Sequence, residues 1–447
     1  MVLEIKNKRN VNKMTIVTIM ILILISFFSE KMENIKLILY AACALVGFFS
    51  TRYTFIIIAL TYTNFFSLFN GLEMQGSMTD FGLIAGLMCF LGETIRYIKE
   101  NNYKITKRLC YDIIYVFIIL SLLASSIIVA NIRYGQPIIR GIYSFRYFFV
   151  SLYMFPFIRF LKKNKQEKYV IMEYLSKIIT LSIIIIIIQV LMMDKIEIIK
   201  LRTAARLGNN RILLHTASPL YIMVFAYNLY DMLNNKKIEF ARVLSIILIL
   251  IAIFIISQTR IFMAGILSVA ILEILVFSKI KSINKIILSI MGICIIFIAF
   301  ETNIINQVVG NLFEDVKKDG DSYIRNEAKK YYMQLIDDDF FLFGGGITNE
   351  KYPNSPVIQA SEYNYYFVDI GIYGVFFEYG ILGIIVIIIL TLTIFTKSFY
   401  IKDKQIANIM KMFCVMVITT LYTVSPFMAG ILILYIMMFA FIKSDIN

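Results

Sequence analysis

The 447-residue sequence is 59% hydrophobic and only 17% charged, with a mean hydropathy of +0.77 and a formal net charge of +14. A chain of this length cannot bury so much apolar surface in one soluble core, so the composition excludes a soluble globular protein. We expect an all-α integral membrane protein whose helices cross the bilayer many times.

About fourteen apolar segments approach or reach the length that a helix needs to cross a bilayer. The first follows the basic residues Lys6, Lys8, Arg9 and Lys13 and lacks a small-residue cleavage site, which favours a retained signal anchor. The segments are 14–29, 35–51, 53–69, 80–97, 109–130, 143–160, 170–192, 212–230, 242–258, 261–278, 285–302, 380–397, 408–424 and 427–443.

The spacing of these segments divides the chain into three parts. Residues 1–302 hold the first eleven expected transmembrane helices, and residues 380–447 hold the last three. Residues 303–379 form a large loop between the eleventh and twelfth helices. Loops of this length without secondary structure are uncommon unless they are functional, so we expect amphipathic helices and the functional site in this part of the chain.

Lysine and arginine residues gather in short connections such as RYIKENNYKITKR, RFLKKNKQEK and NNKKIEFAR. The positive-inside tendency places these connections, and both termini, in the cytoplasm of a bacterial plasma membrane, with the large loop outside. The net charge of +14 then faces anionic lipid as a topology determinant, and no nucleic-acid partner is expected.

The large loop contains a helical pattern and a run of three glycines. Apolar residues recur at helical spacing at Ile324, Ala328 and Leu335, within DSYIRNEAKKYYMQLIDD. In FLFGGGITNE the glycines are not followed by the Lys-Ser or Lys-Thr pair of a nucleotide-binding loop. The loop also lies outside, where ATP is not available, so we interpret the glycines as a backbone bend.

Metal and cofactor sites are not expected. His215 is the only histidine, and the five cysteines lie in or at the ends of apolar segments. No cluster therefore has the spacing of a zinc site or of a disulfide framework.

Arginine is distributed against the positive-inside tendency. A guanidinium offers forked donors that match phosphate or carboxylate oxygens, so an anionic ligand would explain outward arginines. Contact with lipid phosphates is the alternative. Arg202 and Arg206 are four residues apart, and on one helical face they would repel each other unless an anion lay between them. On the expected topology, eight of the fourteen arginines are outward: Arg133, Arg140, Arg146, Arg202, Arg206, Arg211, Arg260 and Arg325.

Five short motifs occur in order over residues 200–390. They are Arg206-Leu207-Gly208, SQTR ending at Arg260, a helix led by Arg325, FGGG ending at Gly346, and EYGILG beginning at Glu378. This order resembles the bacterial O-antigen polymerase and ligase superfamily. Nine residues before Glu378, where ligases of this superfamily carry a His-Asn pair, the chain has Asp369-Ile370, which resembles the Wzy-type repeat-unit polymerases of O-antigen and capsular polysaccharide.

The resemblance implies a GT-C-like, metal-independent membrane glycosyltransferase that uses no nucleotide sugar. Its substrates would be undecaprenyl-pyrophosphate-linked oligosaccharides on the outer leaflet. A polymerase moves the growing glycan from its lipid pyrophosphate to the non-reducing end of a new repeat unit, and a ligase moves the finished glycan to another acceptor. Membrane lipids and a regulator of chain length are further candidate partners.

The chemistry assigns roles to the candidate residues. Arg206 and Arg325 would stabilise the charge that grows on the departing phosphate, and Asp369 would accept the proton of the acceptor hydroxyl. Glu362, seven residues before Asp369, would share a helical face with it and is the reserve base. Glu378 either contacts substrate or anchors the twelfth helix. The candidate substrate-binding residues are Arg202, Arg211, Arg260, Gly344, Gly346, Tyr363 and Glu378.

Three alternatives stay open. The chain could instead be a ligase or a glycan-binding membrane scaffold. The tyrosines of the loop could stack on sugars or form an aromatic belt at the membrane interface. A flippase or another transporter would also have many helices, but its charged residues should line a cavity at mid-membrane depth.

Overall fold

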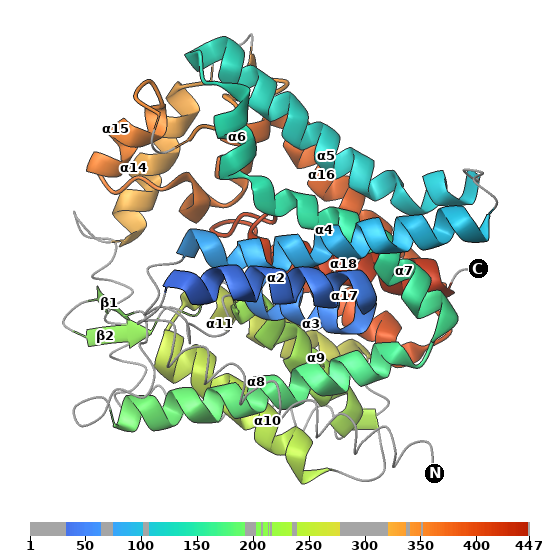
Figure 1. Ribbon diagram of the computed structural model, residues 1–447. Coiled ribbons are helices and arrows are strands. Elements are labelled where there is room, and N and C mark those ends of the chain that lie inside the picture. Colours follow the sequence, from blue (N-terminus) through green and yellow to red (C-terminus); the bar gives the residue numbers. More distant parts are fainter. Residues whose placement is uncertain are drawn as a thin grey trace.

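The structure is a computed structural model in which most of the chain forms helices that run broadly alongside one another (Figure 1). It describes residues 33–63, 75–101, 107–192, 203–206, 209–212, 214, 217–234, 239–277, 321–336, 340–349 and 352–445. The one sheet in these residues is an antiparallel hairpin of β1 (Thr203–Arg206) and β2 (Asn209–Ile212). The all-α expectation is therefore correct for most of the described chain and wrong for this hairpin.

Helices cover the described part of the first half of the chain. Apolar residues dominate nearly all of them, which is why the hydropathy pattern predicts them. In chain order they are α2 (Glu33–Phe49), α3 (Thr51–Tyr62), α4 (Gln75–Glu100), α5 (Lys107–Tyr134), α6 (Ile138–Ser144), the 3-10 helix η3 (Arg146–Tyr153), α7 (Met154–Lys163) and α8 (Glu167–Leu191).

The second half continues in the same way beyond the hairpin. Its elements are α9 (Ser218–Asn234), α10 (Phe240–Ile251), the π-helix η4 (Ala252–Ser257), α11 (Arg260–Leu272), the π-helix η5 (Glu273–Phe277), α14 (Asp321–Gln334), α15 (Pro356–Glu362), the 3-10 helix η7 (Phe367–Ile370), α16 (Ile372–Ser398), α17 (Lys404–Thr420) and α18 (Ala429–Asp445).

The expected apolar segments coincide with helices wherever the structure describes them. Segments 14–29 and 285–302 lie outside the described residues, and each of the others overlaps a helix or a run of short helices. Six helical stretches among the described residues are long and apolar enough to cross a membrane, which fits an integral, multi-pass membrane protein. They are Thr79–Glu100, Ile113–Tyr134, Glu167–Leu191, Phe240–Ser257, Arg260–Phe277 and Ile372–Ser398. Fourteen spans and a GT-C-like arrangement stay predictions.

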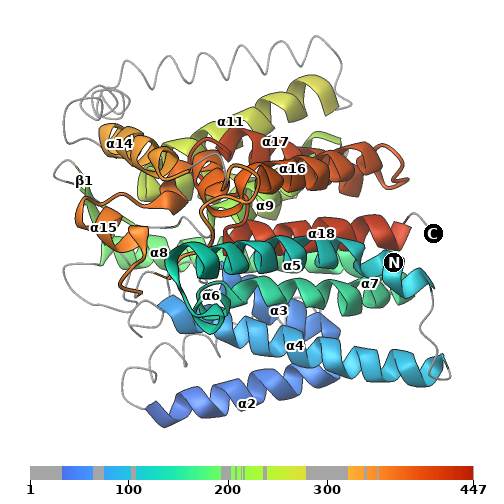
Figure 2. The same cartoon turned by 90° about the horizontal axis from the view of Figure 1, so that it is seen from above.

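Helix α18 lies in the middle of the bundle (Figure 2). Its residues from Gly430 to Ser444 are buried, because it is apolar around its whole circumference and packs against α7, η3, α16, α3 and α9. Its last turn is held by an ion pair from Lys168, near the start of α8, to Asp445. The end of α18 thus marks one end of the bundle.

The elements of the large loop lie at the opposite end. Figures 1 and 2 both place α14, α15 and the β hairpin away from the C-terminal end of α18. Helix α14 has one buried and one exposed face, because Ala328 and Tyr332 are buried while Lys330 is exposed. The structure thus separates a loop-bearing end of the bundle from a C-terminal end.

Candidate functional site

Helix α14 is fixed to the start of α16 by aromatic packing. The Tyr332 ring lies 4.6 Å from the Phe377 ring and 6.1 Å from the Phe367 ring, measured between centroids. The Tyr332 hydroxyl donates a hydrogen bond to the carbonyl oxygen of Tyr365, at 2.9 Å. Buried aromatic pairs with a satisfied hydroxyl hold a helix in one orientation, so the polar residues of α14 have a defined position beside η7 and α16.

Two cations occupy one face of α14. Arg325 is half-buried and Lys329, one turn later, is only 9% exposed. The ammonium of Lys329 lies 3.5 Å from the centre of the Tyr422 ring and 5.0 Å from that of Tyr373. Neither cation has a hydrogen bond or carboxylate partner within the described part of the chain. Like charges at this spacing repel, so this face is suited to an anion.

The neighbouring Lys330 shows what a satisfied cation on the same helix looks like. Its ammonium donates to the Glu327 carboxylate at 2.8 Å, and this hydrogen bond raises the pKa of Lys330. Lys329 has tyrosine rings where Lys330 has a carboxylate. An aromatic face attracts a cation but offers no counter-charge, so the contacts given for Lys329 leave a place for an anionic ligand.

Asp369 lies on η7, which packs against α14. Its side chain is exposed, and η7 ends at Gly371, where φ is +55°. A Cβ at Gly371 would meet the Leu421 carbonyl oxygen at 2.2 Å, so the turn before α18 lies directly against this point. Asp369 is therefore held on an element that packs against α14.

Glu362 does not share a helix with Asp369, so the prediction of one helical face for the two carboxylates is wrong. Helix α15 ends at Glu362, Tyr363 follows it, and Asn364 adopts φ +58°, which reverses the chain before η7. Asparagine is one of the few residues that adopt this conformation readily. Glu362 and Tyr363 are both exposed at the end of α15.

The three glycines form a wedge between two long helices. A Cβ at Gly344 would lie 2.4 Å from the Gly380 nitrogen of α16, and one at Gly346 would lie 2.5 Å from the Ala130 nitrogen of α5. Both glycines also have positive φ, +76° and +83°. The Gly345 amide donates to the Phe377 carbonyl at 2.6 Å. The expected bend is present, and Gly344 and Gly346 are buried against backbone.

The glycine wedge completes the hydrogen bonding of a kinked helix. Within α16, Gly380 has non-helical φ and ψ of +61° and −157°. The amides of Ile381 and Leu382, just after the kink, donate instead to the carbonyls of Phe341 and Leu342, at 3.1 and 3.3 Å. A helix interrupted in this way needs outside acceptors. The FGGG and EYGILG motifs are thus two halves of one structural joint.

Glu378 lies inside this joint. The side chain is 4% exposed, and its Oε1 has no hydrogen-bond donor among the described residues. The Ser126 hydroxyl of α5 donates to the Glu378 backbone carbonyl. Of its two predicted roles, substrate contact and anchoring of the twelfth helix, this position favours anchoring.

The β hairpin carries two of the predicted arginines. Arg206 ends β1 opposite Asn209, and Arg211 of β2 lies opposite Ala204. The prediction of a helix through Arg206 is therefore wrong: Thr203–Arg206 is a strand, and short pairing across the turn outcompetes the helix. Arg202 lies outside the described residues.

The hairpin adjoins the start of α11. Strand β2 packs against η4, which ends at Ser257, and Gln258 then adopts φ +49°. The hydroxyls of Ser257 and Thr259 share a hydrogen bond of 2.7 Å, and Arg260 begins α11. The SQTR motif is thus a break between two helices, and it brings Arg260 to the same region as β2.

Two other arginines that the sequence predicts to be outward bind protein groups. Arg146 makes a paired contact with Asp80, at 2.6 and 2.9 Å. Arg133 donates to the Leu335 carbonyl just after α14 and stacks 4.5 Å from the Phe340 ring. These arginines stabilise the loop-bearing end of the bundle.

Sequence reasoning missed Lys329. It lies four residues after Arg325, a spacing that puts both on one face, but the pair Lys329-Lys330 reads as solvated charge. Lys330 has Glu327 three residues earlier as a partner, whereas the rings beside Lys329, Tyr373 and Tyr422, are distant in sequence. Within the described ranges, no group of three His, Cys, Asp or Glu residues could hold a metal ion.

Comparison with known proteins places part of the chain in a family context. Residues 245–388 match the family model described as O-antigen ligase. The match includes Arg260, α14, the glycine wedge, Asp369 and Glu378. It begins at residue 245, so the motif that ends at Gly208 lies outside it. No curated protein matches the chain. The match supports a place in the O-antigen ligase and polymerase superfamily and a membrane role in glycan transfer.

Proposed function

We propose that the chain is a membrane glycosyltransferase that polymerises undecaprenyl-pyrophosphate-linked oligosaccharide repeat units into a surface polysaccharide. One observation carries the proposal: a pair of cations on α14, Arg325 and Lys329, without a carboxylate partner in the described residues, beside the element that carries Asp369. The match of residues 245–388 to the O-antigen ligase family supports the reaction class.

In the proposed reaction, a hydroxyl oxygen of the acceptor repeat unit attacks the anomeric carbon of the growing glycan. The bond from that carbon to the lipid pyrophosphate breaks, and its electron pair leaves with the pyrophosphate oxygen. Arg325 and Lys329, with Arg206 from the hairpin, stabilise the charge that grows there. Asp369 accepts the hydroxyl proton. Both bond changes need only groups of this chain.

The other candidate residues have supporting roles in the proposal. Arg211 and Arg260, with Arg202 before the hairpin, would hold the second phosphate or the acceptor glycan. Glu362 and Tyr363 at the end of α15 would contact sugar, since both are exposed. Gly344, Gly346 and Glu378 would shape the joint of α16 and so set the position of Asp369 and Tyr373 before it.

The proposal also fixes an orientation. The loop-bearing end would face the outside of a bacterial plasma membrane, with both termini in the cytoplasm, because flipped lipid-linked units are found on that leaflet. Support comes from the basic connections, such as RFLKKNKQEK, at the C-terminal end of the bundle.

A ligase is the second candidate, because the matching family model is described as O-antigen ligase. A polymerase and a ligase break the same bond and differ in the acceptor. Asp369 in place of a His-Asn pair favours the polymerase.

The experiment that tests the proposal analyses lipid-linked glycans after deletion of the gene. Loss of a polymerase leaves single repeat units on the outer leaflet and removes long glycan. Loss of a ligase leaves long glycan on the lipid carrier, and loss of a flippase leaves single units on the inner leaflet. Either of the last two results would overturn the polymerase proposal.

A further inference from the structure

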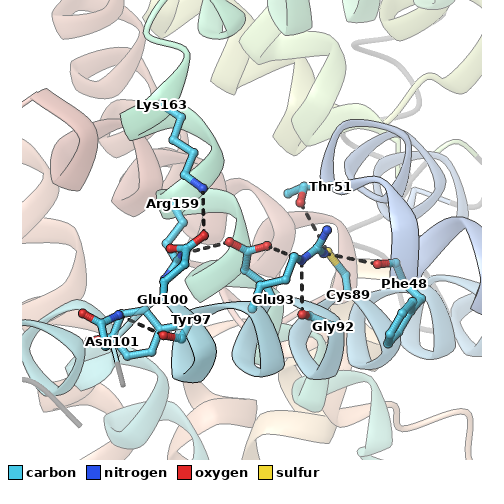
Figure 3. Close-up of polar contacts among 11 residues, drawn as sticks. Phe48, Thr51, Cys89, Gly92, Glu93, Tyr97, Glu100, Asn101, Arg159 and Lys163 are labelled. Atoms are coloured by element: carbon cyan, nitrogen blue, oxygen red, sulfur yellow. Dashed lines mark hydrogen bonds and ion pairs between the residues drawn. The ribbon is translucent and has the colours of Figure 1, made fainter. Parts of the chain in front are cut away.

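A cavity of about 310 Å³ lies at the C-terminal end of the bundle, away from α14 and α15. It is bounded by the junction of α2 and α3, the last turns of α4, and the end of α7 (Figure 3). Its Arg52 pairs with Glu167, and the adjacent Lys168 pairs with Asp445 of α18. These contacts place the cavity near the end of α18, at the opposite end of the bundle from the proposed catalytic site.

The lining of the cavity has an excess of positive charge. Arg52, Arg96 and Lys163 contribute three cations, and Glu93 contributes the one carboxylate. Both oxygens of Glu93 are already used: Oε1 accepts from Arg159 Nε at 2.8 Å, and Oε2 lies 3.0 Å from Arg96 Nε. The carboxylate therefore orients Arg96. Lys163 also lies 3.5 Å from an oxygen of Glu100, and Arg52 pairs with Glu167. Counted with these ion-pair partners and Arg159, the cavity keeps one positive charge in excess, from four cations against three carboxylates.

The guanidinium of Arg96 is held in place by more than Glu93. Its Nη2 donates to the Phe48 carbonyl and its Nε to the Gly92 carbonyl, both at 3.2 Å. Figure 3 labels Phe48 and Gly92, whose carbonyls accept these two hydrogen bonds. A guanidinium fixed at one edge presents its remaining N–H groups in a defined direction, which suits a forked contact with phosphate.

A helix also begins at the cavity. Thr51 is the first residue of α3, and the Ser50 hydroxyl caps the helix by accepting from the Tyr53 amide. The first N–H groups of a helix have no partner within it and carry a partial positive charge, which adds to that of Arg52 and Arg96. The helix start and the side chains thus favour the same kind of ligand.

Apolar side chains continue from the cavity along the outside of α2. Phe49, in the cavity wall, is 72% exposed, and Leu45, one turn earlier on α2, is 61% exposed. Tyr53, on the other wall, is 48% exposed. A free phosphate ion would gain nothing from this surface, whereas the acyl chains of a lipid would cover it.

We propose that this cavity binds the phosphate of an anionic phospholipid headgroup, with the acyl chains along α2. The site is independent of glycan transfer, since it lies at the other end of the bundle. Binding in this cavity differs from the diffuse attraction of anionic lipids to a basic surface, because Arg52, Arg96 and Lys163 line one cavity together with the start of a helix.

The test is native mass spectrometry of the purified full-length protein, titrated with phosphatidylglycerol, phosphatidylcholine or inorganic phosphate. Phosphatidylglycerol should bind at one saturable site, and Arg52→Gln, Arg96→Gln and Lys163→Gln should each weaken it about fivefold. Arg140→Gln, an exposed cation at the opposite end, is the matched control and should bind as the unaltered protein does. The Lys163 side chain is 62% exposed, so we expect its replacement to leave folding intact.

Three results would overturn the proposal. Equal binding of phosphatidylglycerol and phosphatidylcholine would mean no selectivity for net negative charge. Unchanged binding in the Lys163→Gln protein would move the lipid away from the cavity. Inorganic phosphate that displaces phosphatidylglycerol completely at equal concentration would make the site a phosphate site and not a lipid site.

Discussion

Lys329 points its ammonium at the face of Tyr422, with 3.5 Å between the nitrogen and the ring centre. The two residues come from α14 and from the turn between α17 and α18, so their contact joins the large loop to the last helices of the bundle. It also keeps a charged lysine at a buried position where no described carboxylate neutralises it. This contact makes Lys329 the residue through which the proposed reaction can be tested most selectively.

Replacing Lys329 by methionine should remove the positive charge that the proposal places beside the reacting pyrophosphate, while keeping an apolar side chain of similar length. We expect polymer output per unit of membrane protein to fall at least about tenfold, because the charge-assisted contacts of the transition state are worth a few kcal/mol. The measurement is the ladder of glycan lengths on a gel, normalised to the amount of protein.

Lys330→Met is the matched control, since Lys330 is exposed on the same helix and paired with Glu327. Its ladder should be unchanged. If Lys329 serves only to stabilise the fold through Tyr422, Lys329→Met will lower protein abundance and leave the normalised ladder intact.

Arginine-to-lysine exchanges test whether the fork of a guanidinium is needed. Arg206→Lys and Arg325→Lys should each cost on the order of 3 kcal/mol, or about a hundredfold in rate, because one of two donors to the leaving oxygen is lost. Arg140→Lys should keep normal chain length, since Arg140 lies outside the motifs and over the Tyr352 ring. Short chains from all three variants would reject the mapping of the motifs.

The close packing of the glycine wedge predicts that replacing its glycines will destabilise the folded protein. In Gly344→Ala and Gly346→Ala the new Cβ would lie 2.4 and 2.5 Å from backbone nitrogens, and both sites have positive φ. We expect each to cost roughly 2–4 kcal/mol from overpacking and strain together. The loss of stability is measured as the fraction of each detergent-solubilised variant that stays monodisperse after heating.

Gly86→Ala is the comparison variant, because its new Cβ would come no closer than 3.3 Å, to the flexible end of Ile58. It should behave nearly as the unaltered protein. A Gly344→Ala protein with unaltered thermal behaviour would contradict the close packing of the wedge.

The orientation can be tested with introduced cysteines. Asn354, before α15, and Lys165, between α7 and α8, are both exposed and lie at opposite ends of the bundle. Asn354→Cys should react with a membrane-impermeant thiol reagent in intact cells, and Lys165→Cys should react only after lysis. The reverse pattern would place the proposed site in the cytoplasm.

The long apolar helices could be predicted because a continuous run of apolar residues is by itself enough to indicate a membrane-spanning helix. Segments 170–192 and 408–424, for instance, fall on α8 and α17. The amphipathic α14 was also predictable, since Ala328 and Tyr332 follow helical spacing. The family match over residues 245–388 includes four of the five motifs that suggested the family, and Arg206-Leu207-Gly208 lies outside it.

The connections between helices were harder to predict. Arg206 was expected in a helix and lies in a strand, because a two-stranded hairpin depends on pairing with Asn209, not on spacing. Glu362 and Asp369 were expected on one face, but Asn364 reverses the chain between them. Neither the joint of Gly344 with Gly380 nor the rings around Lys329 leave a local signal, since their partners are distant in sequence.

The position of α18 has a consequence for biosynthesis. This helix is buried on all sides, yet every helix that surrounds it, including α3, α7 and α16, precedes it in the chain. During translation the earlier helices must therefore enter the membrane around an interior that is still vacant. The bundle can close only after α18 arrives, so interruption of synthesis before Ala429 should leave these helices exposed to membrane quality-control proteases.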